Sequence, residues 1–202
     1  IGGGCAGISV ATRLKSLKSD LTISIIEPSE KSLYQAAWTL VGAGAYDVNS
    51  TIKPMSSVMP SFVNWIKEYA ESFAPESNSV KTSSGEYSYD YLVVCPGLKL
   101  NFDGVAGLKE SLGKNNVCTN YSADMAVYTW ECLKNLSGGN LLFTEPPMPI
   151  KCAGAPQKIA YLAADHLKKK GALNDSNLEV LCAKPVHQKL LVLRIKILNY
   201  YL

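Results

Sequence analysis

Apolar side chains recur at helical spacing in three stretches of the chain. Just behind the opening glycines, Ile8, Ala11 and Leu14 follow the 3.6-residue period of a helix. Segments 122–136 and 155–170 carry the same pattern, with polar residues on the intervening positions. The pattern therefore predicts three amphipathic helices, each with one face against a core.

Shorter apolar runs, rich in β-branched or aromatic residues, predict strands between and around these helices. Turn residues such as Pro75 and Gly85 separate several of the runs. The alternation of strands and helices predicts an α/β fold, in which several short strands are inserted. The predicted strands are 21–27, 63–73, 79–82, 86–89, 91–95, 141–144 and 178–182.

The opening segment has the glycine spacing of a dinucleotide-binding loop. Gly2, Gly4 and Gly7 form G-x-G-x-x-G directly before the first predicted helix. These glycines allow a tight turn, close approach to a pyrophosphate and close packing of helix on strand. Glu27 ends the next strand, where an acidic side chain can accept hydrogen bonds from ribose hydroxyls. A plain glycine turn with a capping glutamate is the alternative.

The strand that should lead into this loop is represented only by Ile1. We therefore expect that the sequence is a piece of a longer chain.

Further along, Tyr34, Gln35 and Trp38 precede a glycine-rich segment and could line a flat cofactor. The alternative is a helix packed through Trp38 and Val41.

A second strand–loop–helix unit has no glycine fingerprint. Its loop, 145–152, is rich in proline and ends at Cys152, just before the predicted helix. Pro156 suits the first turn of that helix. The helix N-terminus and the cations Lys151 and Lys158 favour a reactive thiolate. A structural cysteine is the alternative reading, and a second nucleotide at this loop is not expected.

Composition excludes several other classes of protein. The chain has 202 residues, of which 47% are hydrophobic, so a packed core is expected. Its net charge of +3 and its lack of a basic stripe argue against nucleic acid. Six widely spaced cysteines without a C-x-x-C pair, and only two histidines, argue against a metal site and favour a reducing compartment. No signal peptide or long apolar span is predicted.

Four segments together resemble one enzyme family. They are GGGCAGISVATRL, EPSEKSLYQAAWTLVGAGA, SYDYLVVCPGLKLNF and PIKCAGAPQKIAYL. Over residues 1–182 the chain resembles the N-terminal part of the sulfide:quinone oxidoreductases of the mitochondrial type. The resemblance implies a Rossmann-like FAD-binding domain of the two-dinucleotide-binding-domain flavoproteins, with the start of a second α/β unit. The domains would be 1–137 and 138–184, followed by a divergent tail, 185–202.

The resemblance also implies an activity and a site. The family oxidises sulfide through a pair of redox cysteines and passes electrons through FAD to ubiquinone at the mitochondrial inner membrane. A persulfide sulfur then passes to an acceptor such as sulfite or glutathione. Cys152 matches the first redox cysteine, and the cofactor would contact matched residues elsewhere. These are Gly2, Gly4, Cys5, Ala6 and Gly7 at the pyrophosphate, Glu27 at the ribose, Gln35 at the flavin and Ala70 at the adenine.

The chain departs from the family in two ways. No residue matches the second redox cysteine, since Cys118 and Cys182 lie at the wrong positions. Beyond Cys182 the likeness stops, and the apolar tail could form a terminal helix, an edge strand or a short membrane-surface helix. An altered exon or a frameshift would explain this tail. The competing readings are another two-domain flavoprotein, such as a type II NADH dehydrogenase, and a non-catalytic FAD-binding fragment.

Overall fold

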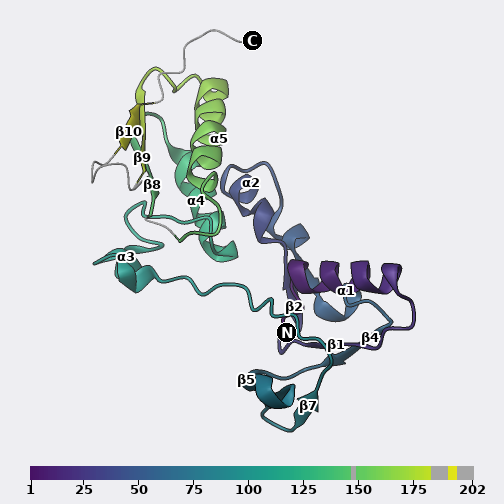
Figure 1. Ribbon diagram of the computed structural model, residues 1–202. Coiled ribbons are helices and arrows are strands. Elements are labelled where there is room, and N and C mark those ends of the chain that lie inside the picture. Colours follow the sequence, from purple (N-terminus) through teal and green to yellow (C-terminus); the bar gives the residue numbers. More distant parts are fainter. Residues whose placement is uncertain (147–148, 183–190, 195–202) are drawn as a thin grey trace. The chain divides into compact units, whose positions relative to one another are not determined.

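The computed structural model describes residues 1–146 and 149–182, and the backbone of 191–194 (Figure 1). It contains two compact units. Unit 1 comprises Ile1–Tyr34 and Asn49–Lys99, and unit 2 comprises Gln35–Val48 and Leu100–Leu202. Each unit is therefore built from two separate stretches of chain. The sequence predicts instead three consecutive parts, 1–137, 138–184 and 185–202. This domain division stays a prediction.

Unit 1 begins with the predicted helix behind the glycine loop and adds three small sheets. Strand β1 pairs in parallel with β4, β2 pairs antiparallel with β3, and β5, β6 and β7 form an antiparallel meander. Short 3-10 turns lie at Met55–Ser57 and Pro75–Ser77, and a third, Val48–Thr51, begins at the last residue of the first unit 2 stretch. The elements are α1 (Cys5–Leu17), β1 (Ile23–Ile26), β2 (Lys31–Leu33), β3 (Ile52–Pro54), β4 (Val63–Ile66), β5 (Ala70–Ala74), β6 (Ser79–Thr82) and β7 (Glu86–Ser88).

A compact apolar cluster joins the parallel pair to the meander. Ile26 of β1, Ile66 of β4 and Val80 of β6 are buried together. Ala70 and Ile1 pack against this cluster. Burial of these side chains, at about 25 cal/mol per Å² of apolar surface, holds the two small sheets as one body.

Two of the predicted strands differ from the structure. The single strand expected over 63–73 is interrupted after Ile66, where the backbone N–H of Glu68 turns back to the Ile66 carbonyl. Segment 91–95 is not a strand, so that prediction was wrong. Its backbone hydrogen bonds go to one residue: the Ile1 amino group donates to Val93, and the Cys95 N–H donates to Ile1. A ladder one residue long does not make a strand.

Unit 2 contains a strand–helix–strand unit with helices on one face of its sheet (Figure 1). Strand β8 runs parallel to β9 through α5, and β10 is antiparallel at the edge. The tail therefore includes an edge strand at Leu191–Arg194; its other residues lie outside those described. The elements are α2 (Trp38–Gly42), α3 (Leu108–Ser111), α4 (Ala123–Asn135), β8 (Gly139–Glu145), α5 (Ala155–Lys170), β9 (Ser176–Cys182) and β10 (Leu191–Arg194), with 3-10 turns at Gln35–Ala37 and Phe102–Gly104.

The core of unit 2 lies between α5 and the sheet. Ala160, Ala163 and Leu167 of α5 are fully buried, and Phe143 and Val180 pack on the same side. Small alanines let the helix approach the strands closely, while Leu167 fills the remaining space. Gly171 ends the helix in the left-handed conformation, at φ 78°, as its position in the sequence predicts.

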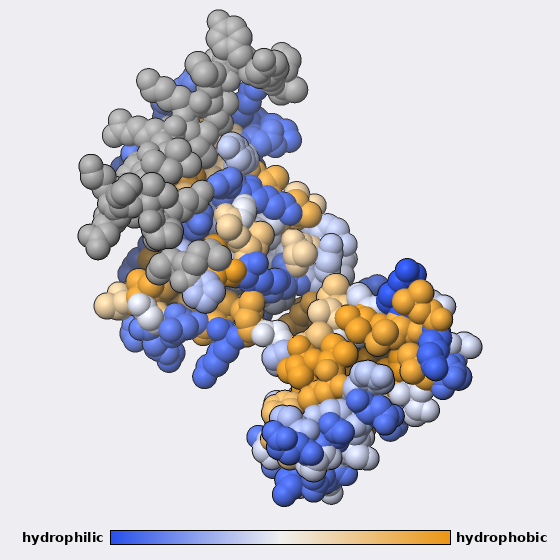
Figure 2. All heavy atoms as spheres, in the orientation of Figure 1, coloured by the Kyte–Doolittle hydropathy of each residue, from blue (hydrophilic) through white to orange (hydrophobic). Residues whose placement is uncertain are grey.

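Several large apolar side chains of unit 1 lie on its surface instead of in its core. Figure 2 shows hydrophobic residues gathered on the face of this unit that is in view. Leu17 is 66% exposed, and Leu14, Leu33 and Val94 are also open to solvent. These side chains contribute little to the cohesion of unit 1.

Shortening the buried leucine of α5 is expected to destabilise the chain strongly. Leu167 is 0% exposed and contacts the cluster around Ala164 and Leu178. Leu167→Ala should lower the free energy of unfolding by about 2–5 kcal/mol, because it leaves a cavity. Urea unfolding followed by circular dichroism measures the change. Leu17→Ala removes the same atoms at an exposed site and should change stability by less than about 0.5 kcal/mol; equal effects would contradict this account of the core.

Candidate functional site

The glycine loop of unit 1 is closed by contacts that only glycine allows. Gly2 has φ 94°, and a Cβ there would overlap the carbonyl oxygen of Cys95. A Cβ on Gly7 would overlap the carbonyl oxygen of Gly2. The first and third glycines of the motif are therefore needed for the turn itself and for seating α1 against it.

The middle glycine faces open space. A Cβ on Gly4 would meet nothing within 4 Å, and Gly4, Cys5 and Ala6 are all exposed. Among the described residues no side-chain hydrogen bond caps α1 at Gly4, and the first N–H groups of a helix have no partner within the helix itself. The opening therefore fits the pyrophosphate of a dinucleotide such as FAD, which needs close backbone approach and N–H donors.

Glu27 lies directly beside the loop, at the end of β1. Its Oε2 accepts the N–H of Gly3 at 2.7 Å, and its Oε1 accepts the N–H of Ser29 at 2.7 Å. The indole N–H of Trp65 donates to the Glu27 carbonyl at 2.8 Å. These bonds orient the carboxylate and leave it further lone pairs for hydroxyl donors. Ala70 lies on β5, so unit 1 contains every predicted residue of the nucleotide part of the site.

Cys152 lies in unit 2, exposed, on the turn that leads into α5. Its carbonyl accepts two hydrogen bonds: the N–H of Ala155 at 3.2 Å and the hydroxyl of Tyr121 at 3.3 Å. The backbone is thus held while the thiol stays accessible. This arrangement suits a cysteine that must react with a small molecule.

Gln35 lies in the same unit and is hydrogen-bonded to two residues next to this cysteine. Its amide Nε2 donates to the Tyr121 carbonyl at 3.3 Å, and its Oε1 accepts a hydrogen bond from Lys151 Nζ. Two residues predicted separately, Gln35 and Cys152, are therefore brought together through Tyr121 and Lys151. The sequence did not single out Tyr121, because its loop carries no recognisable motif.

A buried carboxylate lies at the end of β8 near this group. Glu145 is only 5% exposed, and its Oε2 has no hydrogen-bond partner among the described residues. Burial raises the pKa of Tyr121, and the negative charges of the Cys152 thiolate and the Glu145 carboxylate raise it further. Tyr121 therefore remains a protonated donor to Cys152 over the physiological range.

Removing the charge of Glu145 tests this grouping. Glu145→Gln should lower the pKa of Tyr121 toward its usual value of about 10, because one nearby negative charge is lost. Tyrosine-labelled NMR measures the titration, and Tyr121→Phe assigns the resonance. Since the raised pKa stabilises the folded chain only below the pKa of the unfolded phenol, stability should fall as the pH rises above it. An unchanged Tyr121 titration in Glu145→Gln would show that the two groups do not interact.

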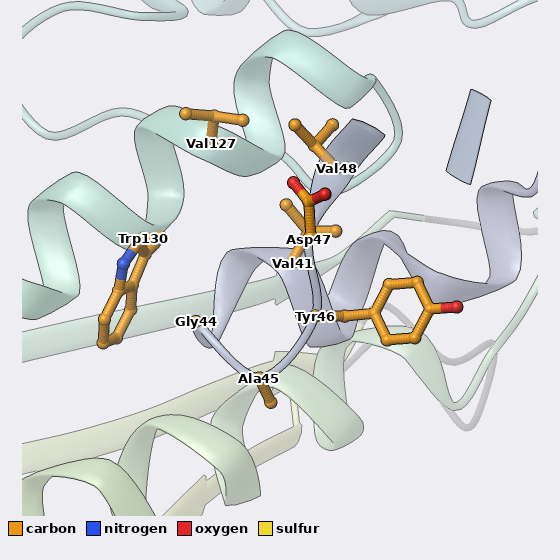
Figure 3. Close-up of a pocket in the computed structure, with 8 residues that line it drawn as sticks. All are labelled: Val41, Gly44, Ala45, Tyr46, Asp47, Val48, Val127 and Trp130. Atoms are coloured by element: carbon orange, nitrogen blue, oxygen red, sulfur yellow. The ribbon is translucent and has the colours of Figure 1, made fainter. Parts of the chain in front are cut away.

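Unit 2 also has an open pocket between α2 and α4, with a cavity volume of about 480 Å³ (Figure 3). Val41, Val127 and Trp130 supply much of its apolar wall, and Tyr46 and Asp47 supply polar groups. None of the predicted site residues lines it. Trp38 and Val41 are buried against α4, so the segment around them forms the packed helix that was the alternative reading.

Other kinds of site are absent from the described part of the chain. Over residues 1–146 and 149–182, no group of three or more metal-ligating side chains comes together. No described helix has the length and apolar character needed to cross a membrane.

Known proteins match this chain over most of its length. The family described as FAD-NAD(P)-binding matches residues 1–93. The mitochondrial sulfide:quinone oxidoreductase of Mus musculus is 41% identical over 179 residues, which cover 88% of this chain and 40% of the relative. The mitochondrial sulfide:quinone oxidoreductase of Dictyostelium discoideum is 47% identical over 174 residues, which cover 85% of this chain and 38% of the relative.

A solved structure agrees with these relatives. The sulfide:quinone oxidoreductase of Aquifex aeolicus superposes with a TM-score of 0.73 at 29% identity, covering 91% of this chain and 42% of the other. The chain thus spans about two fifths of the length of the proteins it matches. The expected α/β, Rossmann-like fold and the expected cofactor, FAD, are confirmed. Over most of its length, this chain is a homologue of the mitochondrial-type sulfide:quinone oxidoreductases, a family of FAD flavoproteins.

Proposed function

We propose that this chain supplies the FAD-binding loop and the sulfide-reactive cysteine of a sulfide:quinone oxidoreductase. The observation that carries the proposal is the setting of Cys152. Its thiol is exposed before α5, and Tyr121 holds its carbonyl beside Gln35. A nicotinamide-dependent flavoprotein would need a glycine fingerprint at this loop, and the chain has Cys152 there instead. This difference favours sulfide chemistry over a type II NADH dehydrogenase.

The residues of unit 1 would hold the adenine dinucleotide half of FAD. The loop Gly2, Gly4, Cys5, Ala6 and Gly7 would bind the pyrophosphate through backbone N–H groups at the start of α1. Glu27 would accept hydrogen bonds from the ribose hydroxyls, and Ala70 would contact the adenine through its backbone. In unit 2, Gln35 would bind at the flavin. When bound, FAD supplies two-electron redox chemistry.

Cys152 would carry the sulfur. In the proposed reaction, hydrosulfide would attack a disulfide between Cys152 and the second redox cysteine of the family, for which this sequence offers no match. The S–S bond would break, so that one cysteine keeps a persulfide while the other leaves as a thiolate. When bound, FAD would supply the redox chemistry that carries the two electrons of sulfide to ubiquinone. The persulfide sulfur passes to an acceptor such as sulfite or glutathione. Tyr121 would act as a positioning residue, since it holds the backbone of Cys152 and not its sulfur.

The proposed setting is the mitochondrion, with peripheral association at the inner membrane, where ubiquinone is found. The relatives from Mus musculus and Dictyostelium discoideum are mitochondrial by name. No nucleic-acid partner is proposed, because the net charge of +3 is small for that purpose.

A second candidate is a non-catalytic FAD-binding chain. Cys152 is a free thiol, and no disulfide joins it to another cysteine in the part of the chain that the structure describes. The reaction of the family needs two redox cysteines. Without the second one, this chain would bind FAD but would not oxidise sulfide. The two candidates agree on FAD and differ on sulfide.

One experiment separates them. The purified chain is loaded with FAD, its flavin absorbance is measured, and sulfide and a soluble quinone are added in turn. Bleaching of the flavin by sulfide and its recovery with quinone would support the oxidoreductase. Flavin binding without bleaching would support the non-catalytic chain. Absence of flavin binding would overturn both.

A further inference from the structure

Two cysteines that the proposed function does not use lie next to each other in unit 2. Cys132 is on α4, and Cys118 is in the segment that leads to this helix. Both are free thiols and partly buried, and their sulfur atoms are 3.6 Å apart. Fourteen residues separate them in sequence. Only the tertiary contact between the segment and α4 brings these two sulfurs together.

The position of Cys118 is set by several neighbours. Its thiol lies 3.4 Å from the Asn116 carbonyl, and the Asn116 N–H donates to the hydroxyl of Tyr128 at 3.2 Å. The hydroxyl of Thr129, on the same helix, donates to the Met125 carbonyl at 2.9 Å and lies near enough to the Cys118 thiol to lower its pKa. The segment is therefore attached to α4 beside the sulfur pair. The bonds hold the two sulfurs at a distance from which about 1.5 Å of approach completes an S–S bond.

We propose that Cys118 and Cys132 form a reversible intramolecular disulfide, a modification site separate from Cys152. The partner is a small disulfide such as oxidised glutathione. Two adjacent thiols favour this product over a stable mixed disulfide, because the second thiol is already at the reacting sulfur.

The exchange proceeds in two balanced steps. The Cys132 thiolate attacks one sulfur of the small disulfide, which releases one small thiol and leaves a mixed disulfide on Cys132. The Cys118 thiolate then attacks the Cys132 sulfur, the bond to the second small thiol breaks, and the protein disulfide forms. The protein loses two protons and two electrons, and one small disulfide becomes two thiols.

The environment of Cys118 favours this order. Burial and the neighbouring Cys132 raise the pKa of Cys118 to about 12. Cys118 is therefore the poorer first nucleophile at neutral pH. Once Cys132 is in a mixed disulfide, its hydrogen bond and charge no longer raise the pKa of Cys118, and burial alone still opposes ionisation of the thiol that completes the exchange.

The sequence offers a direct assay. Trypsin cleaves after Lys114 and Lys134, so both cysteines lie in one peptide, 115–134. The folded chain is incubated in glutathione redox buffers, and the remaining thiols are alkylated. After digestion with trypsin, the mass of peptide 115–134 is measured by mass spectrometry. We expect it to lose two hydrogen atoms with no alkyl group added, and to recover both thiols after reduction. Chymotrypsin cuts at aromatic residues between the cysteines and should leave two pieces joined.

Three variants complete the test. Cys118→Ser and Cys132→Ser should each abolish the internal link completely and leave a glutathione adduct or a free thiol on the remaining cysteine. Cys152→Ser should leave the yield of the link unchanged. Circular dichroism confirms that each variant is folded. The proposal is overturned if the folded chain shows only single glutathione adducts, or if the link forms only in denaturant.

Discussion

Replacing Cys152 with serine is expected to abolish sulfide-dependent reduction of the flavin while FAD stays bound. Serine keeps the size of the side chain, but its hydroxyl neither forms a disulfide nor carries a persulfide. The hydrogen bonds to the Cys152 carbonyl come from Ala155 and Tyr121 and involve only the backbone of residue 152, so the turn should persist. The rate of flavin bleaching by sulfide should fall on the order of 10³-fold or more.

The control is a cysteine outside the proposed machinery. Cys132→Ser makes the same chemical change on α4 and should leave both flavin binding and the bleaching rate as in the parent chain. Stopped-flow absorbance at the flavin band measures both variants at equal flavin content. Bleaching that survives in Cys152→Ser at the parent rate would refute the role of this cysteine. Loss of flavin from the variant would place Cys152 in cofactor binding instead.

The second large effect is expected at the glycine loop, where two alanine substitutions should fail for different reasons. Gly4→Ala adds a methyl group to open space, so the chain should fold normally. The methyl group would stand where the pyrophosphate approaches, and FAD affinity should fall about 100-fold or more. Gly7→Ala adds a methyl group onto the Gly2 carbonyl, so it should destabilise unit 1 itself.

Thermal unfolding without FAD, followed by flavin titration, distinguishes the two variants. Gly4→Ala should unfold at the parent temperature and bind FAD weakly. Gly7→Ala should unfold at a lower temperature, since relieving the overlap requires backbone movement. If Gly4→Ala bound FAD as tightly as the parent chain, this loop would not be the pyrophosphate site. If Gly7→Ala were as stable as the parent, the close seating of α1 would be unimportant.

Local sequence signals predicted some elements closely and others poorly. Helix α5 spans Ala155–Lys170, as predicted, because Pro156 lies in its first turn, Gly171 ends it and the apolar period between them is unbroken. Segment 91–95 has an equally apolar sequence and is not a strand, because a strand also needs a partner of sufficient length. Strand formation depends on distant residues, whereas much of a helix boundary is local.

The sequence by itself predicted the likeness to the sulfide:quinone oxidoreductases, the FAD-binding fold and the candidate cysteine, because glycine spacing, helix signals and the KCAGAPQK segment are encoded in short stretches. Tertiary structure alone decided which side chains surround that cysteine. Gln35 is more than a hundred residues from Lys151 in the chain, yet the two are hydrogen-bonded, and Glu145 lies buried near Tyr121. The same holds for the sulfur atoms of Cys118 and Cys132. Such contacts depend on how helices pack on a sheet, and packing is a property of the whole unit that no single segment specifies.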